Sequence, residues 1–497
     1  MKELLVGIDV GTTTTKALLM DADGHALASA SEAYPLITPG IGLCEQRAED
    51  WWSALVHTVK QVCADPEKAR RVRGISLSTQ GGTLVPVDRD FRPLANAIVW
   101  SDVRCEAERA AFAALFGPDH LYRVTGWRLG RGLPAMELRH MRDHQSDLFR
   151  SASYFLTVPD YIFARLTGRP AVDLSNAGIN QLTDIRAGRY DPAILDFAGV
   201  REDQLAPLVP SCQPVGRLTH DAALALGLPE DVTVSSGAHD QYAVALGAGI
   251  CQAGDAVIGT GTAWVVTALG DEPDFESGFA QSLSATSGKW GSMLSISTGG
   301  VCLDWFRSRV SGREDSPLDY DELNSLAEHG EPGSGGIRFY PYFGGSGQPE
   351  PDGRLKGTFL GLDLSHHRGH MARAVMEGVA CQAVWAMRVM ERRRPMGRLF
   401  LSGGAAKSPV WTRIIAGLAG RPVYVPGVPD VACAGAAMMA GVGAGLFEDT
   451  PRAAGRMTQG SRVVEPEQSE AYMEVFDSYL RGARALGGVY DAVLLND

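Results

Sequence analysis

The sequence predicts an α/β protein built from two related domains. At 497 residues the chain is too long for one simple core. Apolar strands alternate with amphipathic helices along it. A strand–glycine/hydroxyl turn–strand unit near the N-terminus recurs about 250 residues later. We therefore expect an N-terminal domain over residues 1–246 and a C-terminal domain over residues 247–497.

The first strand–turn–strand unit opens the chain. Residues 4–9 form an apolar strand closed by Asp9, and residues 17–20 form the return strand. Between them, Gly11 is followed by the hydroxyls of Thr12, Thr13 and Thr14 and then by Lys16. Such a turn can approach a phosphate closely and offer it N–H and O–H donors. A polar hairpin without a ligand is the alternative, and the segment lacks the GxxxxGK[ST] pattern of a Walker loop.

The second unit opens the C-terminal half. Residues 256–258 form a strand, Gly259, Thr260 and the next two residues form the turn, and residues 263–267 return. Two such units indicate that each domain offers one phosphate-facing hairpin.

Asp240 is the candidate catalytic carboxylate. It follows a β-branched strand at residues 231–236 and precedes an Ala/Gly-rich apolar run that predicts a closely packed helix. A carboxylate at a strand end is well placed to take a proton from a hydroxyl group. A simple helix N-cap is the alternative for an Asp in such a turn.

Two polar interruptions follow strands in the first half. Thr79 and Gln80 come after a strand at residues 74–78, and Asp102 follows Trp100 after a strand at residues 97–99. Each of these two segments could contribute to a sugar site, and each could equally be an ordinary loop. An amphipathic helix is expected over residues 49–62, and a capped helix begins near residue 158.

The C-terminal half contains a long helix and a glycine pair. Residues 370–391 predict the helix, and residues 399–401 predict a strand that leads into Gly403 and Gly404. Ser408 and Pro409 fit the N-cap and first position of the next helix. The glycine pair would let a flat ring lie against the backbone.

Composition excludes several classes of partner. The net charge is −12, and the one dense basic run is residues 392–394, so we expect no nucleic acid or anionic membrane partner. The N-terminus does not predict a signal peptide, and the uncharged residues 431–447 favour a buried helix over a membrane span. The eight cysteines form no CxxC, which is typical of reduced thiols in a cytoplasmic protein.

At this point the chain resembles the FGGY family of carbohydrate kinases nearly end to end. The most specific element is residues 357–362, then seven residues, then residues 370–377, which fit the family's second signature. The two hairpins resemble its phosphate motifs, and Gly403, Gly404, Ser408 and Trp411 resemble its adenosine motif. The resemblance implies the two-domain actin/Hsp70/hexokinase-like ATPase fold, with a cleft between the domains.

The resemblance also implies roles for residues. Asp240 is expected to be the general base and Asp9 to hold Mg²⁺ through water. The other expected contacts fall into two groups. ATP is assigned to Thr12, Thr13, Thr14, Lys16, Gly259, Thr260, Gly300, Gly404 and Ser408. The sugar is assigned to Thr79, Gln80, Asp102 and Gln241. Dimers are common among similar kinases, so a homodimer is the assembly that the resemblance offers.

The substrate expected is D-xylulose, phosphorylated to D-xylulose 5-phosphate, because the overall pattern looks most like xylulokinases. Four departures lie on the substrate side: Thr79-Gln80, Asp240-Gln241, residues 137–139 and residues 345–349. They leave open another ketose or a polyol, such as ribulose, a deoxy-ketose, glycerol or erythritol. From a different class, a partner-driven ATPase of the actin/Hsp70 type would need no sugar base.

Overall fold

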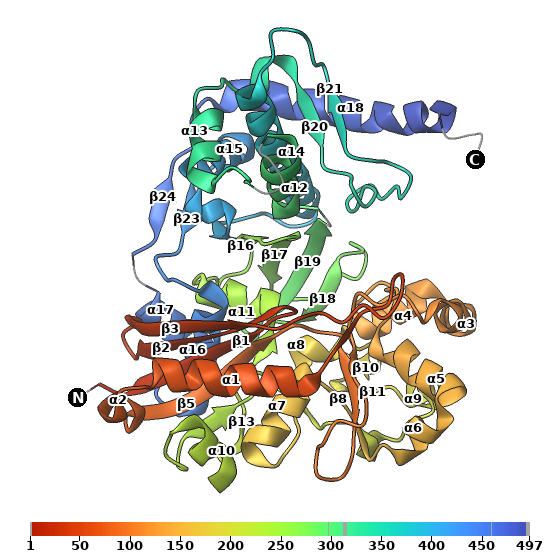
Figure 1. Ribbon diagram of the computed structural model, residues 1–497, viewed down its shortest axis with the longest axis vertical. Helices are drawn as coiled ribbons and strands as arrows, with labels where there is room; N and C mark the ends of the chain where they lie inside the picture. The colour runs from red at the N-terminus through yellow and green to blue at the C-terminus, as the bar shows by residue number, and fades with distance from the viewer. Residues whose placement is uncertain (1, 297, 312–315, 459, 494–497) are drawn as a thin grey trace. The chain divides into compact units, whose positions relative to one another are not determined.

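The computed structural model describes residues 2–296, 298–311, 316–458 and 460–493. The chain forms two compact units, each assembled from separate segments. The first contains residues 1–253, 269–292 and 428–459, and the second contains residues 254–268, 293–427 and 460–497. Both mix helices and strands, which confirms the α/β prediction (Figure 1).

The first unit is organised around a seven-stranded sheet in the order β13-β14-β5-β1-β2-β3, with β15 also paired to β5. The N-terminal strands β1 to β3 form an antiparallel meander. β5 pairs parallel with β1, and both β14 and β15 pair parallel with β5. The sheet strands are β1 (Leu4–Val10), β2 (Thr14–Asp21), β3 (Ala26–Ala33), β5 (Val72–Thr79), β13 (Pro214–Arg217), β14 (Thr233–Ser235) and β15 (Ala238–His239).

Helices cover both faces of this sheet. On one face α1 (Ala48–Val62) buries Trp51, Leu55 and Val59 against alternate apolar residues of β1 and β2. On the other face α16 (Val431–Gly443) packs on β1 and β5 (Figure 1). A Cβ added to Gly7 would lie 1.8 Å from the carbonyl oxygen of Cys433, so the strand and the helix approach through a glycine. α16 is thus the buried helix that residues 431–447 predict.

The same close packing joins α16 to α11 (Asp240–Gly247). A Cβ on Gly435 would lie 2.0 Å from the Ala243 carbonyl oxygen, and one on Gly247 would lie 1.9 Å from that of Val431. Small residues on both helices therefore let their backbones touch. This fixes the position of the helix that begins with Asp240.

The remainder of the first unit has a second core beside a four-stranded sheet in the order β4-β7-β6-β8. Its strands are β4 (Glu45–Gln46), β6 (Leu84–Val87), β7 (Ala97–Ile98) and β8 (Tyr154–Thr157). The further helices of the unit are α2 (Pro66–Ala69), α3 (Glu106–Phe116), α4 (Pro118–Thr125), α5 (Pro134–His144), α6 (Ser146–Ser151), α7 (Val158–Thr167), α8 (Leu174–Ala177), α9 (Pro192–Ala198), α10 (His220–Leu226) and α17 (Thr450–Met457). Short strands complete it: β9 (Val172–Asp173), β10 (Thr183–Asp184), β11 (Arg189–Tyr190), β12 (Leu208–Val209) and β18 (Ala280–Leu283).

The second unit repeats the N-terminal arrangement. β16 (Ala256–Thr260) pairs antiparallel with β17 (Trp264–Gly270) and parallel with β22 (Leu399–Gly403). β22 in turn pairs with β23 (Val423–Val425), and β23 with β24 (Arg462–Val464). The strand–turn–strand repeat seen in the sequence is therefore a structural repeat.

Helices pack against one another in this unit, and α14 (Arg368–Glu391) contacts α13 (Tyr320–Glu328) and α15 (Pro409–Ala419). The remaining elements are β19 (Trp290–Ile296), α12 (Gly300–Trp305), β20 (Arg338–Tyr340), β21 (Thr358–Leu360) and α18 (Ser469–Val493). None of the eight cysteines, all within the described ranges, forms a disulfide, and seven of them are buried, as their spacing predicts.

Candidate active site

The first unit brings the ends of three parallel strands together. Asp9 lies near the end of β1 opposite Ser78 of β5, and Thr79 of β5 lies opposite His239 of β15. Asp240 follows directly. The carboxyl ends of parallel strands are where open α/β sheets place their ligands. One edge of one sheet therefore carries Asp9, Thr79, Gln80 and Asp240, which the sequence assigns to metal, sugar and catalysis. Asp102 follows β7 of the four-stranded sheet instead.

Asp240 is the first residue of α11, and His239 occupies the N-cap position. The N-cap alternative for Asp240 therefore does not hold. Its Oδ1 lies 3.0 Å from His239 Nδ1, but that nitrogen accepts the Gln241 N–H at 3.4 Å. Asp240 Oδ1 is buried with no hydrogen-bond partner, while 34% of the side chain remains exposed. A substrate hydroxyl would reach the exposed part of this carboxylate.

The environment keeps Asp240 ionised. Burial raises the pKa of this carboxyl, but the His239 ring and the N–H groups of Gln241 outweigh burial and hold the pKa below its ordinary value. At neutral pH the side chain is a partly exposed carboxylate. Those are the properties that a proton acceptor needs.

Asp9 lies in a cluster of charges within the first unit. Burial, followed by the charges of Asp430 and Asp240, raises the pKa of Asp9 to about 7, although the Ser78 hydroxyl donates to its Oδ1 at 2.6 Å. Lys16 lies opposite Asp9 in the β1–β2 register and pairs with Asp430 at 2.9 Å. The positive charge of Lys16 and the negative charge of Asp430 offset each other in this ion pair. The carboxyl groups of Asp9 and Asp240 then give this part of the site an excess of negative charge.

A divalent cation fits this excess, because carboxylate oxygens are the ligands Mg²⁺ prefers. Within the described ranges Asp9, Asp430 and Asp240 do not form a compact cluster of ligand atoms. The arrangement thus suits a Mg²⁺ ion that keeps most of its water.

Thr12 links the glycine/hydroxyl turn to the polar residues on the sugar side. Its hydroxyl donates to Gln80 Oε1 at 3.0 Å and accepts from Trp100 Nε1 at 3.3 Å. Gln80 Nε2 donates to the Gly11 carbonyl oxygen at 3.3 Å and to Gln46 Oε1 at 3.0 Å. Every polar group of the Gln80 amide is thus engaged within the protein, and Gln80 fixes the turn.

The other predicted contacts of the first unit differ in exposure. Thr79 is buried and accepts from Asn176 Nδ2 at 3.3 Å. Asp102 is fully buried, and both its oxygens accept hydrogen bonds from Arg104. Thr13 is exposed, and Thr14 and Gln241 are half-buried.

The structure points to site residues beyond those assigned. Trp100 is 47% exposed and contacts Thr12, and the sequence signal for it was its place in the Trp-x-Asp-x-Arg pattern. Asp430 gives no such signal. It caps α16 by accepting the Cys433 N–H, and it is 414 residues from its partner Lys16.

In the second unit the predicted phosphate turn holds the predicted adenosine loop. The Thr260 hydroxyl donates to the Ser402 carbonyl oxygen at 2.6 Å and accepts the Ala405 N–H at 3.0 Å. The Gly404 N–H donates to the Thr260 carbonyl oxygen at 2.7 Å. Gly403, at φ +95°, permits this approach because a Cβ there would lie 2.4 Å from that same oxygen.

The other residues predicted to contact the nucleotide in this unit lie around this loop. Ser408 caps α15 by accepting the Trp411 N–H at 3.1 Å, with Pro409 in the first turn, as predicted. Its hydroxyl also donates to Asn324 Oδ1 at 2.6 Å. Gly300 donates its N–H to the Gly261 carbonyl oxygen at 3.1 Å, next to Gly259 and Thr260.

The signature at residues 370–377 has a structural role. Glu377 on α14 is buried and accepts from Arg373 Nε at 3.0 Å, from the Gly333 N–H at 3.1 Å and from Ser334 Oγ at 2.9 Å. These contacts fasten the glycine-rich loop at residues 333–336 to the long helix.

Comparison with known proteins agrees with this geometry. The N-terminal domain of the FGGY family of carbohydrate kinases matches residues 4–247, and the C-terminal domain of that family matches residues 255–444. A xylulose kinase of Bacillus subtilis (strain 168) is 29% identical over 96% of this chain and 95% of its own length. A gluconokinase of the same strain is 27% identical over 88% of this chain and 87% of its own length.

Solved structures extend the comparison to the fold. The xylulose kinase of Rhodospirillum rubrum has a TM-score of 0.87 and 26% identity, covering 98% of this chain and 100% of its own. The fold is therefore the two-domain actin/hexokinase-like α/β fold. Sugar phosphotransfer uses ATP and, in this class of enzyme, a divalent metal. The chain belongs to the FGGY family of carbohydrate kinases and is similar to xylulokinases.

Proposed function

We propose that this kinase phosphorylates D-xylulose to D-xylulose 5-phosphate, with Asp240 as the general base. The observation that carries the proposal is a partly exposed, ionised Asp240 carboxylate at the edge of the sheet that also holds Asp9. Asp240 accepts the proton of the sugar hydroxyl, whose oxygen forms a bond to the γ-phosphorus of ATP. The bond from that phosphorus to the β–γ bridging oxygen breaks, and ADP leaves.

The other roles follow the two turns. Asp9 would hold Mg²⁺ through water, and the ion neutralises charge on the transferred phosphate. The nucleotide would contact the first turn through Thr12, Thr13, Thr14 and Lys16. In the second unit it would contact Gly259, Thr260, Gly300, Gly404 and Ser408. We assign the Mg²⁺ contact and the first-turn contacts to the domain at residues 1–246. The nucleotide contacts of the second unit are assigned to the domain at residues 247–497.

An uncharged sugar is favoured by the polar groups around Thr12. Its described side-chain partners Gln80 and Trp100 are neutral, and so are the Gln46 and Thr83 side chains that contact Gln80. A gluconate carboxylate needs a cation or a focused set of donors. Thr79, Gln80, Asp102 and Gln241 remain the predicted sugar-side residues.

The test is sugar-dependent ADP release with Mg·ATP. The panel contains D-xylulose, L-xylulose, D-ribulose, D-gluconate, glycerol and erythritol, and Asp240→Asn serves as the control for chemistry at this site. We expect turnover with D-xylulose that the variant loses. Turnover with gluconate alone would replace the substrate and keep the kinase. ATP hydrolysis that no sugar stimulates would favour the partner-driven ATPase.

The setting is proposed on more general grounds. No helix in the described ranges is long and apolar enough to cross a bilayer. We infer a cytoplasmic location, because ATP is supplied there and because cysteines that form no disulfide, such as these eight, stay reduced there. Light scattering of the purified enzyme tests the proposed homodimer.

A further inference from the structure

A second cluster of ligand-type side chains lies in the first unit, between α3 and α5. Cys105 immediately precedes α3, and Glu108 lies in the first turn of that helix. His140 and His144 lie four residues apart in the last turns of α5, on one helix face. None of these residues belongs to the candidate active site. The described part of the chain contains one group of His, Cys and acidic ligand atoms within 4.8 Å of one another: Cys105, Glu108 and His140.

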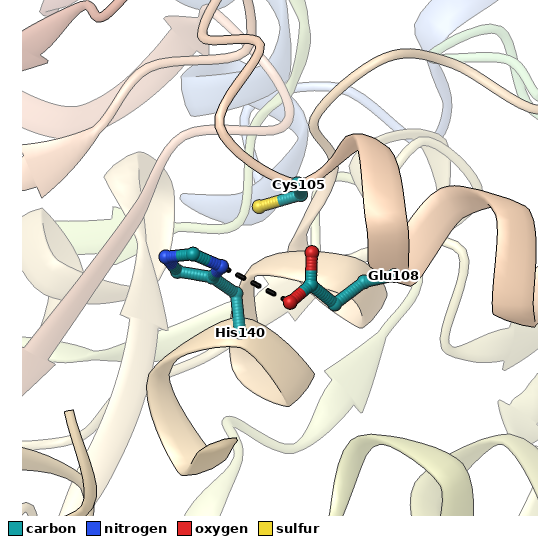
Figure 2. Close-up of side chains that lie close together, drawn as sticks. All are labelled: Cys105, Glu108 and His140. Atoms are coloured by element: carbon teal, nitrogen blue, oxygen red, sulfur yellow. Dashed lines mark hydrogen bonds and ion pairs between the residues drawn. The ribbon is translucent and has the colours of Figure 1, made fainter. Parts of the chain in front are cut away.

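The side chains point toward one another. Figure 2 shows the Cys105 thiol, the Glu108 carboxylate and the His140 ring converging from three directions. Glu108 Oε1 lies 3.1 Å from His140 Nδ1 and 3.1 Å from His144 Nε2. The two imidazole rings lie 4.5 Å apart, centroid to centroid. Cys105 is fully buried, Glu108 is 6% exposed and the His140 side chain is 17% exposed, so these three ligand types are largely shielded from water.

One carboxylate oxygen of Glu108 has no hydrogen-bond partner among these side chains. Its Oε2 is buried and makes no hydrogen bond, whereas both histidines contact Oε1. Leaving a buried carboxylate oxygen unpaired is costly, because the oxygen loses its hydrogen bonds to water and gains none in the protein. An internal Glu–His ion cluster would therefore leave one oxygen and the adjacent thiol unexplained. A cation bound by the second oxygen accounts for both.

We propose that Cys105, Glu108 and His140 bind a divalent transition-metal cation of the zinc type. Thiolate, imidazole and carboxylate together are the ligands of Zn²⁺, which binds them at about 2.0–2.3 Å. Each of the three side chains offers a ligand atom within 4.8 Å of the other two, so one cation can be reached by all of them. His144, beside His140, is placed to complete the shell directly or through water.

The role of such a cation is structural. It ties the N-terminal turn of α3 to the C-terminal turn of α5, two helices of the second core of this unit. A ligand that binds only the folded state raises its stability by RT ln(1 + c/Kd), where c is the free ligand concentration. The metal should therefore raise the thermal midpoint.

The experiment measures Zn²⁺ binding to the full-length enzyme after its affinity tag has been removed and its metals have been chelated. Competition against a chromophoric chelator gives affinity and stoichiometry, and Co²⁺ substitution reports thiolate ligation by its charge-transfer absorption. The variants are Cys105→Ser and His140→Ala. Their matched controls are Cys63→Ser, a buried thiol in the other core, and His57→Ala, an exposed histidine.

We expect one equivalent of Zn²⁺ per chain, a higher Tm with the metal, and a cobalt–thiolate band. Cys105→Ser should abolish the band, and each ligand variant should weaken binding at least about tenfold. Both controls should keep the band and the affinity. Circular dichroism checks folding, and Glu108→Gln, which preserves side-chain size, replaces any ligand variant that does not fold. Absence of stoichiometric binding, or affinity unchanged in all the folded ligand variants, would overturn the proposal.

Discussion

The Thr12 hydroxyl donates a 3.0 Å hydrogen bond to Gln80 Oε1. One residue belongs to the first glycine/hydroxyl turn and the other follows β5. Gln80 also donates to the Gly11 carbonyl oxygen. Gln80 therefore holds the backbone and the side chain of the first glycine/hydroxyl turn at once, and it ties the turn's geometry to the residues next to β5.

Replacing Gln80 with Ala should impair phosphotransfer. The change removes the Gln80 hydrogen bonds to the Thr12 hydroxyl, the Gly11 carbonyl oxygen and the buried Gln46 amide. Thr12 keeps its contact with Trp100 and Gly11 keeps the Tyr34 hydroxyl, so the turn loses the support of Gln80 but not all of its partners. We expect kcat/KM to fall at least about tenfold as the turn loses its position. Steady-state kinetics with both substrates measures the effect. Thr83→Val is the matched control, because Thr83 donates to Gln80 only at 3.4 Å. Near-native kinetics for Gln80→Ala would contradict the role.

Asp240→Asn should lower kcat by about 10²- to 10⁴-fold, because the amide keeps the shape but cannot accept the proton. The pKa of Asp240 is held below its ordinary value, so the base is ionised at every pH above that. The wild-type rate should then show no acid limb from Asp240 between about pH 5 and 8. Pre-steady-state rates and a pH profile test both statements, with the exposed Asp221→Asn as control. A variant with normal single-turnover rates would remove Asp240 from the chemistry.

Mg²⁺ should stabilise the enzyme more at about pH 8 than at about pH 6. The pKa of Asp9 is raised to about 7, so below that pH a proton occupies the carboxyl that the cation needs. In the metal-free enzyme the folded state binds this proton more tightly than the unfolded state. The contribution of Asp9 to stability is therefore present below its unfolded pKa and is lost as the pH rises through about 7.

Thermal midpoints with and without MgCl₂ at the two pH values measure this dependence. Asp9→Asn should remove the pH-dependent part of the Mg²⁺ effect and should raise the midpoint of the metal-free enzyme at about pH 8. An equal Mg²⁺ effect at both pH values in the wild-type enzyme would contradict the assignment.

Gly435→Ala should destabilise the first unit by about 1–3 kcal/mol, because the new methyl group meets the Ala243 carbonyl oxygen at 2.0 Å. The helix cannot yield freely, since Gly247 holds a similar contact with Val431. Thermal unfolding measures the loss. Gly455→Ala on α17 is the control, because nothing lies within 4 Å of its added Cβ and the change should be neutral or slightly stabilising. Equal midpoints for the two variants would refute the close packing.

The sequence predicts local elements well where strand, turn and strand are contiguous. The first hairpin, the second hairpin and the Ser408 cap all appear within a few residues of their expected positions. Each depends on neighbours in the chain, so its hydrogen-bonding pattern is visible in a short window.

Contacts between distant segments are not visible in the same way. Lys16 pairs with Asp430 across 414 positions, and no periodicity signals that pair. Gln80 has the composition of a sugar contact, yet its amide is engaged by Gly11, Gln46 and Thr12, which only the folded sheet brings near. Its assignment to the sugar stays a prediction, as do the assignments of the other site residues.

The position of α16 bears on how the protein is made. When residues 1–253 have been synthesised, β1 and β5 exist but α16 does not. The backbone of α16 is what later packs against Gly7 and Gly74. One face of the sheet therefore waits for more than 170 further residues before its cover is synthesised. Folding of the N-terminal unit cannot finish during synthesis of its own first segment, and the uncovered sheet is the surface that a nascent-chain chaperone would shield.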